Sequence, residues 1–506
     1  MKIFTCGQIK EIDAYTIEHE PVESVDLMDR AAGKLFSWIA SHYSKSRHFI
    51  IFTGPGNNGG DGLALARMMV SSGFNAEVFH ISISPKTSKD WNINRKRLED
   101  IPAIRFNVIE SAARMPVIEP GAVIIDAVFG SGLTRQADGL AAEAIKKING
   151  YGAEIISIDV PSGLFCEDNS GNNDETIIHS DFTLSFQFPK LAFMFADNYR
   201  FTGEWVILDI GLHPGIISAA ETPYSFITES DVLPILKKRH KFDHKGVFGH
   251  GLMISGSKGK MGAAILSSEA ALRTGIGLLT CHVPGCGYMI MQTAIPEAMV
   301  LTDASEDKIT ALDEISRFGA IGIGPGIGTA TETQSMMKGL LEKCSKPMVI
   351  DADGLNILSM NKDWLGLIPP GSVLTPHPKE FERIAGPSAN GYKQLMRQIA
   401  FSGEHSCIVA LKGAYTAVSL PDGRVFFNST GNPGMATGGS GDVLTGMILS
   451  LLSQGYSPED AAIIAVFLHG MAGDIAAEQD SCESVIASDI INSIGQAFKK
   501  IRTSKK

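Results

Sequence analysis

Paired cysteines, basic runs and membrane-length apolar stretches are scarce in this sequence of 506 residues. Its seven cysteines are scattered singly with no Cys-X-X-Cys pair, a pattern typical of a reducing compartment and of a chain without structural zinc. The net charge of −11 argues against nucleic acid or an anionic membrane as the main partner, because such proteins usually carry a basic excess. Since Met1–Cys6 shows no signal-peptide pattern and no apolar run reaches membrane-spanning length, we expect a cytoplasmic protein.

The length of the chain predicts at least two domains, each large enough to bury a core. Apolar runs followed by a glycine-rich turn and a helix recur in both halves, which predicts an α/β fold. Residues 212–240 look like a connector with one short helix, so we predict domains at residues 1–218 and 225–506. The clearest predicted strands are His48–Thr53, Ala76–Ile81, Ala122–Asp126, Glu154–Asp159, Leu252–Ser255, Ala320–Gly324, Pro347–Asp351 and Cys407–Lys412.

A glycine-rich turn, Gly54–Gly62, follows the first of these strands and leads into a helix predicted from residue 63 to about residue 72. The turn contains one GxGxxG match, but the next strand does not end in the acid that a dinucleotide fingerprint requires. Asn57, Asn58 and Asp61 carry oxygens that suit a hard cation or a sugar hydroxyl. Asparagine is also common in left-handed turns, so this segment alone leaves both interpretations open.

Two further strands of the first half end in acids, Asp126 and Asp159, and each is followed by a small-residue loop. In an open parallel sheet, ligands bind at the carboxyl ends of the strands, near the switch in strand order. Any one of these carboxylates could be a helix cap. Three polar strand ends together predict one site.

The second half contains a glycine-rich loop, Gly431–Asp442, that runs directly into an apolar helix. Such a loop turns its N–H groups toward one point, and the helix N-terminus adds a partial positive charge, so the loop predicts an anion site. Asp442 would repel a phosphate held there. It makes sense as a base that takes a proton from a hydroxyl beside the phosphate, or as a cation ligand, with a plain helix cap as the alternative.

Other glycine-marked strand ends of the second half carry binding candidates. The loop around Gly326 permits close approach of the backbone to a ligand. His377 lies between two prolines on a stiff loop, where it contacts substrate or is a plain surface histidine. Lys412 ends a strand, where it meets nucleotide phosphates or is simply solvated.

The first half resembles the NAD(P)HX epimerase family, which has a Rossmann-like three-layer αβα fold, in the strings GPGNNGGDG, DAVFGSGL, SIDVPSG, FPK and GEWVILDIG. The resemblance implies a nicotinamide cofactor hydrated at C6 as substrate and interconversion of its R and S forms. It implies Asp159 as the proton-transfer or substrate-contacting acid, and K⁺ held by the oxygen donors Asn58, Asp126 and Ser162. The positions that it places around the substrate are Asn57, Asn58, Gly59, Gly60, Asp61, Gly130, Ser131, Gly132, Leu133, Thr134, Arg135, Gln136 and Asp159.

The second half resembles the ribokinase-like ADP- or ATP-dependent NAD(P)HX dehydratases in HKGVFGHG, GSKGKMGAA, GPGIG, VIDADGLN, LTPHPKEF, LKGAYT and GNPGMATGGSGDVLTG. The resemblance implies that Asp442 takes the proton of the C6 hydroxyl as phosphate is transferred, and that loss of phosphate restores the nicotinamide double bond. Mg²⁺ accompanies the nucleotide, with Asp351 and Glu380 only weak candidates for its ligands. The implied substrate contacts are Ala264, Gly326, His377 and Asp442, and the implied nucleotide contacts are Lys412, Gly413, Ala414, Tyr415, Thr416 and Gly441.

Together the two resemblances predict a bifunctional repair enzyme for hydrated NADH and NADPH that uses ADP or ATP and forms a homo-oligomer, without a nucleic-acid or membrane partner. Two alternatives stay open. A small-molecule kinase fused to a regulatory Rossmann-like domain would use the same loop but keep the phosphate on its product. A first half that only binds, for example RNA, is disfavoured by the acidic balance and by Asn58, Asp126, Asp159 and Ser162.

Overall fold

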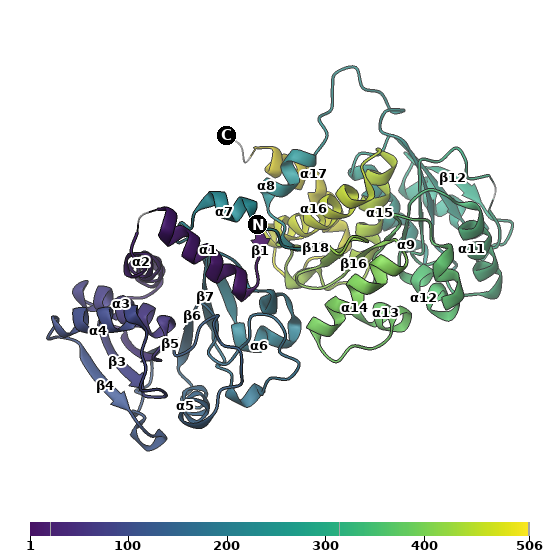
Figure 1. Ribbon diagram of the computed structural model, residues 1–506. Coiled ribbons are helices and arrows are strands. Elements are labelled where there is room, and N and C mark those ends of the chain that lie inside the picture. The colour runs from purple at the N-terminus through teal and green to yellow at the C-terminus, as the bar shows by residue number, and fades with distance from the viewer. Residues whose placement is uncertain (21, 313, 504–506) are drawn as a thin grey trace. The chain divides into compact units, whose positions relative to one another are not determined.

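The computed structural model describes residues 1–20, 22–312 and 314–503. Its contacts divide the chain into two compact units. The N-terminal unit consists of Lys2–Thr222 with Asn390–Tyr392, and the C-terminal unit of Met1, Pro223–Ala389 and Lys393–Lys506. In Figure 1 most of the first is purple to blue, and most of the second is teal to yellow.

The N-terminal unit is built on a seven-stranded parallel sheet with the order β4-β3-β2-β5-β6-β7-β8. Because β5 pairs with β2 on the side away from β3, the strand order reverses direction there, as in Rossmann-like folds. The predicted strands of this half are all present. Their bounds are β2 His48–Thr53, β3 Asn75–Ile81, β4 Arg105–Ile109, β5 Val123–Ala127, β6 Glu154–Ile158, β7 Phe182–Phe186 and β8 Glu204–Leu208, and a short β1, Lys2–Ile3, precedes the first helix.

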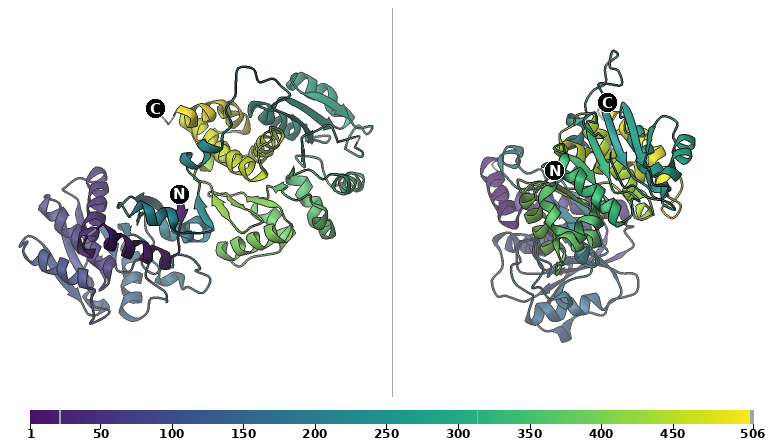
Figure 2. Two further views of the ribbon diagram at one scale, coloured as in Figure 1. Left: turned by 45° about the horizontal axis from the view of Figure 1, so that its top comes forward. Right: turned by 90° about the vertical axis from the view of Figure 1, so that its right-hand side faces the viewer.

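Helices cover both faces of this sheet, because alternate residues of its strands point to opposite sides. Phe49 and Ile51 pack with residues of α2, α3 and α4, whereas Ile50 and Phe52 belong to the core that includes α5. The result is the expected three-layer αβα arrangement (Figures 1 and 2). The helices are α1 Cys6–His19, α2 Ser24–His42, α3 Asn57–Ser71, α4 Lys89–Glu99, α5 Gly139–Asn149, α6 Tyr199–Thr202 and α7 Pro214–Ala219.

The C-terminal unit has a larger sheet, in which consecutive strands have the order β9-β18-β17-β16-β15-β14-β13-β10-β11-β12. The strands from β16 to β12 run parallel, and β17 is antiparallel to both of its neighbours. The connector predicted at residues 212–240 is only partly correct, since Tyr224–Phe226 forms β9 beside β18. The bounds are β9 Tyr224–Phe226, β10 His250–Ile254, β11 Leu278–Val283, β12 Met299–Thr302, β13 Ala320–Ile323, β14 Met348–Ile350, β15 Val373–Leu374, β16 Ile408–Leu411, β17 Ala417–Ser419 and β18 Val425–Phe427.

Two helical layers also flank this second sheet. One core contains α9, α15, α16 and α17, and the other contains α11, α12 and α13. α16 is long and apolar enough to cross a membrane by length and composition, so our expectation that no apolar run reaches that length is wrong; 78% of its apolar window is buried inside the structure. The helices are α8 Glu229–Val232, α9 Met261–Arg273, α10 Tyr288–Ala294, α11 Thr331–Lys343, α12 Ala352–Met360, α13 Pro378–Ala385, α14 Gly391–Glu404, α15 Ser440–Ser453, α16 Pro458–Gln479 and α17 Ala487–Thr503.

Two candidate active sites

The carboxyl ends of β5 and β6 hold the first candidate site, in the N-terminal unit. Asp126 lies in β5 and is fully buried, and it accepts hydrogen bonds from Ser162 Oγ at 2.5 Å and Ser162 N at 2.8 Å. Ser157 Oγ donates at 2.7 Å to Asp126 Oδ2, the oxygen that also accepts from Ser162 N. Burial raises the pKa of Asp126, and these hydrogen bonds partly oppose the rise. A cation beside this cluster would favour the charged form.

Asn58 joins the same cluster from the start of α3. Its Nδ2 donates to Phe129 O at 2.8 Å, and Ser162 Oγ lies 3.2 Å from the same carbonyl oxygen. Ser162 therefore contacts both Asp126 and the Phe129 carbonyl oxygen that Asn58 also contacts, which joins the three predicted K⁺ ligands in one cluster. Among the described residues no lysine, arginine or histidine nitrogen lies within 4.0 Å of the Asp126 carboxylate, so hydrogen bonds and not an ion pair stabilise it.

The helix that carries Asn58 begins earlier than the sequence predicts, at residue 57 instead of residue 63. The predicted turn is wrong because glycines in this segment serve close packing inside the helix. A Cβ on Gly59 would lie 1.9 Å from Gly54 O, and one on Gly60 would lie 2.8 Å from Met28 Sδ. Gly59 and Gly60 are thus buried against the protein, whereas Asn57 is exposed at the first helical position.

Asp159 follows β6 in a left-handed backbone conformation, with φ +64°, and is held by a lysine. Lys190 Nζ lies 2.9 Å from Asp159 Oδ1, and Ser131 N donates to Oδ2 at 3.2 Å. Lys190 is almost fully buried, and its Nζ also donates to Ser185 Oγ at 2.9 Å. Burial would raise the pKa of Asp159, but the ion pair with Lys190 and the hydrogen bonding of Ser131 together hold that pKa below its usual value. This carboxylate is therefore ionised at neutral pH.

Two further carboxyl groups near Asp159, those of Asp61 and Asp13, have raised pKa values instead of a lowered one. Burial and the negative charge of Asp159 raise the pKa of Asp61 well above its usual value. The same two causes, in the same order, raise the pKa of Asp13 on α1 to about 6. Neighbouring acids whose pKa values diverge in this way can act as a charged group and a proton donor in one site.

The predicted substrate loop after β5 is divided between the site and the surface. Ser131 is tied to Asp159, and a Cβ on Gly130 would lie 3.2 Å from Asn58 Oδ1, so these two positions border the cluster. Further along, Leu133 is half-buried, and the exposed residues are Gly132, Thr134, Arg135 and Gln136. The side chain of Gln136 donates to Gly171 O.

The second candidate site lies at the N-terminus of α15, in the C-terminal unit. The N-cap of that helix is Gly439, with φ +91°, and Asp442 is the third residue of the helix. The helix-cap alternative for Asp442 is therefore wrong, since no side chain caps α15. Among the described residues no hydrogen-bond partner is found for its half-buried carboxylate. Burial, followed by the charge of Asp351, raises the pKa of Asp442 to about 7, although Lys412 partly opposes this.

Lys412 reaches the same place from the end of β16, and it is paired there. Its Nζ lies 2.9 Å from Asp351 Oδ1, and Thr445 Oγ1 donates to Asp351 Oδ2 at 2.7 Å. A Cβ on Gly441 would lie 3.1 Å from Lys412 Nζ. Lys412 is therefore neither a solvated surface lysine nor an unpaired cation. Its ammonium group lies directly beside the glycine loop.

The loop around Gly326 contacts the start of α9. Ser257 Oγ donates to Gly326 O at 2.6 Å, and a Cβ on Gly326 would lie 2.9 Å from Lys260 O and 3.1 Å from Ala263 Cβ. Asp353 links this loop to the rest of the site. It accepts from Gly328 N at 2.9 Å and pairs with Lys260 at 3.1 Å, and its charge also acts on Asp442. Ala264 is fully buried one position beyond this contact.

His377 has a structural role that the sequence did not predict, as the N-cap of α13. Its Nδ1 accepts from Lys379 N at 3.1 Å, while Glu380 Oε2 accepts from His377 N at 2.8 Å, which forms a capping box. Pro376 O, one residue earlier, accepts from Lys412 N at 2.9 Å, so this loop lies beside the lysine. The predicted nucleotide segment Gly413–Thr416 connects the antiparallel strands β16 and β17, and Thr416 Oγ1 accepts from Gly413 N at 3.3 Å.

Known proteins match the chain along both units. A family described as NAD(P)H-hydrate dehydratase matches residues 251–496, and one described as YjeF-related protein N-terminus matches residues 24–192. The bifunctional NAD(P)H-hydrate repair enzyme of Moorella thermoacetica is 32% identical over 517 residues, which cover 99% of this chain and 97% of that protein. The chain belongs to the bifunctional NAD(P)H-hydrate repair enzyme family.

Solved structures also resemble part of this repair-enzyme family member. A ribokinase-like superfamily protein from Enterococcus faecalis is 27% identical with a TM-score of 0.50, covering 56% of this chain and 98% of that one. This match confirms the expected ribokinase-like fold. An ADP/ATP-dependent NAD(P)H-hydrate dehydratase from Bacillus subtilis, crystallised with ATP and Mg²⁺, is 28% identical with a TM-score of 0.48 and covers 55% of this chain and 98% of that one.

Two residues of this family member were missed by sequence reasoning. The first is Lys190, which pairs with Asp159. The string FPK could have indicated this pair, because a lysine next to the end of a buried strand needs a partner for its charge. His469 on α16 is the other; its Nε2 lies 3.4 Å from Ser440 Oγ at the start of α15, and burial lowers its pKa to about 4. A neutral imidazole therefore borders the glycine loop at physiological pH.

Across residues 1–20, 22–312 and 314–503, no group of three or more His, Cys, Asp or Glu side chains is placed to hold a metal ion. The predicted K⁺ ligands are not of this kind, since Asn58 and Ser162 supply amide and hydroxyl oxygens.

Proposed function

We propose that this chain repairs hydrated NADH and NADPH in two steps, one in each unit. The N-terminal unit interconverts R- and S-NAD(P)HX, and the C-terminal unit dehydrates the S form with ADP or ATP as co-substrate. The observation that carries the proposal is the half-buried Asp442 carboxylate, which has a pKa of about 7 and lies in the first turn of the helix that follows the glycine-rich loop. A general base is most effective when its pKa lies near the working pH.

In the dehydratase step, Asp442 accepts the proton of the C6 hydroxyl while that oxygen attacks the terminal phosphate of the nucleotide. The bond between that phosphate and the rest of the nucleotide breaks, which leaves AMP from ADP or ADP from ATP. The C6–O bond then breaks as phosphate departs, C5 loses a proton, and the nicotinamide double bond is restored. The N–H groups at the start of α15 face the developing negative charge.

The nucleotide is held by the segment from Lys412 to Thr416 and by Gly441 in this proposal. Lys412 Nζ borders the position where a Cβ of residue 441 would stand, so only glycine leaves that space to a phosphate. Gly326 and His377 border the hydrated nicotinamide, while the third predicted contact, Ala264, is buried next to the residues of α9 that pack against Gly326. Mg²⁺ would neutralise the phosphates, but Asp351 and Glu380 do not fit as its ligands, because hydrogen bonds or ion pairs already engage their carboxylates.

In the epimerase step, Asp159 is the charged group that contacts the substrate or moves its proton, and Lys190 positions it. Asn58, Asp126 and Ser162 fit K⁺, because they present oxygen donors around a buried carboxylate with no cationic side chain beside it. The ion would supply a fixed positive charge near the substrate phosphates. Epimerase activity is therefore expected to fall when K⁺ is replaced by tetramethylammonium.

In the experiment, the protein is incubated with ADP and a mixture of R- and S-NADHX, and the formation of NADH is measured by its absorbance. The readings are taken early, so that spontaneous epimerisation contributes little. Wild type should recover all of the NADH, Asp159→Asn about half, and Asp442→Asn none. Asp138→Asn and Asp480→Asn are matched controls, since both aspartates are exposed and neither side chain caps its helix. Retention of phosphate on a product, seen by ³¹P NMR, would instead establish the kinase alternative.

We also propose that the enzyme acts in the cytoplasm as a homo-oligomer. The single unpaired cysteines and the acidic balance of the chain support a reducing, non-nucleic-acid environment. Sedimentation velocity of the full chain measures the oligomeric state, and a single species at 54.1 kDa would refute that part of the proposal.

A further inference from the structure

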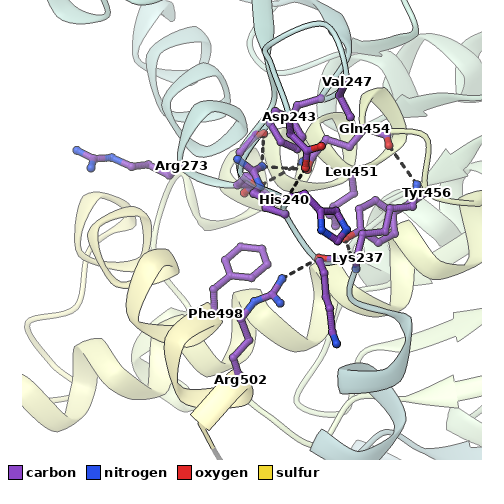
Figure 3. A pocket seen from close by; sticks show the side chains of 15 residues that line it. Lys237, His240, Asp243, Val247, Arg273, Leu451, Gln454, Tyr456, Phe498 and Arg502 are labelled. Carbon is purple, nitrogen blue, oxygen red and sulfur yellow. Dashed lines mark hydrogen bonds between the residues drawn. The ribbon is translucent and has the colours of Figure 1, made fainter.

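A cavity of about 680 Å³ lies in the C-terminal unit among the segment 237–248, the ends of α9 and α15, and α17 (Figure 3). It is remote from the candidate dehydratase site. Asp442 lies in the first turn of α15, whereas Leu451 and Gln454, at the other end of that helix, line the cavity. At a rise of about 1.5 Å per residue the two places are roughly 18 Å apart along the helix.

The rim of this cavity is strongly cationic in a chain whose net charge is −11. Among its lining residues Asp243 is the one carboxylate, and it accepts from His240 N at 2.6 Å. The cationic residues that line it are Lys237, Lys238, Arg239, Arg273 and Arg502.

These cations are held mostly by backbone carbonyls. Lys237 Nζ donates to Gly455 O at 2.7 Å, Arg239 donates to Gly275 O at 2.5 Å, and Arg502 donates to Lys237 O at 2.9 Å, as Figure 3 shows for the last of these. In the described part of the chain, no carboxylate lies within 4.0 Å of the charged nitrogens of Lys237, Lys238, Arg239 or Arg502. The charges of Lys237, Arg239 and Arg502 are therefore oriented by carbonyl groups without being neutralised by an acid.

The cavity also offers flat apolar surface behind this rim. Phe498 and Phe248 are half-buried, and Tyr456 and Leu451 are buried. Lys237 Nζ lies 4.4 Å above the Tyr456 ring, and the Arg239 guanidinium lies 3.9 Å above the Phe248 ring, which fixes both cations against the wall. Phe498 is the third aromatic side chain of this wall, and cations that bind phosphate beside such a ring suit an anion that also carries a planar ring.

We propose that this pocket binds a nucleotide through its phosphates, at a second site separate from the dehydratase centre. The inference goes beyond the repair reaction, and it needs neither hydrated cofactor nor turnover to be tested.

Equilibrium dialysis of the full-length protein against ATP, and separately against inorganic triphosphate, counts the sites. Wild type should bind two ATP per chain. Lys238→Gln/Arg502→Gln should weaken one of them by about tenfold, since each exposed charge-assisted contact contributes about a factor of three. The matched control is Lys343→Gln/Lys362→Gln, which removes the same charge at exposed positions outside the pocket.

The variant Arg502→Lys tests whether lost binding comes from the lost charge or from a damaged fold. It keeps the positive charge and should therefore retain most of the ATP binding. If wild type binds inorganic triphosphate in the pocket and the pocket variant does not, the phosphates alone are recognised. If the pocket variant loses ATP binding although wild type does not bind triphosphate there, the ring of the nucleotide contributes to binding. One ATP per chain in wild type would overturn the proposal, as would equal binding by the pocket variant and the control. A pocket variant that changes only the sedimentation coefficient would assign the surface to a second copy of this chain instead.

Discussion

Replacing Asp442 by Asn is expected to abolish dehydration and, at the same time, to stabilise the C-terminal unit at neutral and alkaline pH. The two effects have one cause. The carboxylate is half-buried beside Asp351, and no hydrogen bond to it is found among the described residues, so its charged form is poorly compensated. The site tolerates this because the charged form is the base that the reaction needs. Loss of that base should lower the dehydration rate by about 10²- to 10⁴-fold.

The size of the stability effect follows from the pKa of about 7, against an ordinary value of 3.8. A raised carboxyl pKa means that the folded state binds the proton more tightly, so stability falls as pH rises from about 4 and levels off above about 7. At about 1.4 kcal/mol per pH unit the upper limit is about 4 kcal/mol. Because the carboxylate is partly solvated, about 2 kcal/mol is a realistic value, which corresponds to a rise in Tm of about 4 °C.

Thermal melts of wild type, Asp442→Asn and the exposed control Asp480→Asn at pH 4 and pH 8 measure this effect. The advantage of Asp442→Asn should appear at pH 8 and largely vanish at pH 4, while Asp480→Asn follows wild type. Two units can give two transitions, so the transition that changes with ADP is the one to follow. An Asp442→Asn protein that is no more stable than wild type at pH 8, or equally more stable at both pH values, would refute the reasoning.

Three other changes test neighbouring parts of the structure. The kcat/KM of dehydration should rise with pH through a limb near pH 7, and Asp351→Asn should move that limb to lower pH because a negative charge next to Asp442 is removed; an unmoved limb would contradict this. Lys190→Met should destabilise the N-terminal unit by about 3–5 kcal/mol, seen by urea unfolding, because its buried carboxylate partner is left unpaired. Gly439→Ala should cost about 1–3 kcal/mol in the same assay, whereas Gly438→Ala, which has open space and no left-handed φ, should be neutral.

The strand ends of the N-terminal unit could be predicted because each buried strand is a short apolar run with an abrupt polar end. Asp126 and Asp159 lie where those runs stop, and a parallel sheet brings such ends to one edge. The start of α3 could not be predicted, since glycines normally indicate a turn. Only the contact of Gly59 with the Gly54 backbone shows why glycine is needed inside the helix.

Partners from distant parts of the chain account for most of what the sequence missed. Lys190 is 31 residues after Asp159, and the Ser440–His469 contact joins two helices, so neither pair has a local spacing signal. The strand β9 was not predicted because its three residues are all half-buried and therefore show no alternation of buried and exposed positions. Asp442 was identified correctly as unusual, because an acid in an anion cradle conflicts with local electrostatics and such conflicts occur at functional sites.

The Asp351–Lys412 ion pair allows the proposed dehydratase centre to discriminate among anions, because an anion that binds Lys412 must compete with the Asp351 carboxylate. A small anion that reaches Lys412 must compete with a carboxylate only 2.9 Å away, and it gains little from the exchange. A nucleotide is different, because it also engages the helix N-terminus and the Gly413–Thr416 turn, and those contacts offset the loss of the pair. Cellular phosphate, although abundant, would therefore be a weak competitor, and discrimination against it would reside in an ion pair that is formed before either substrate binds.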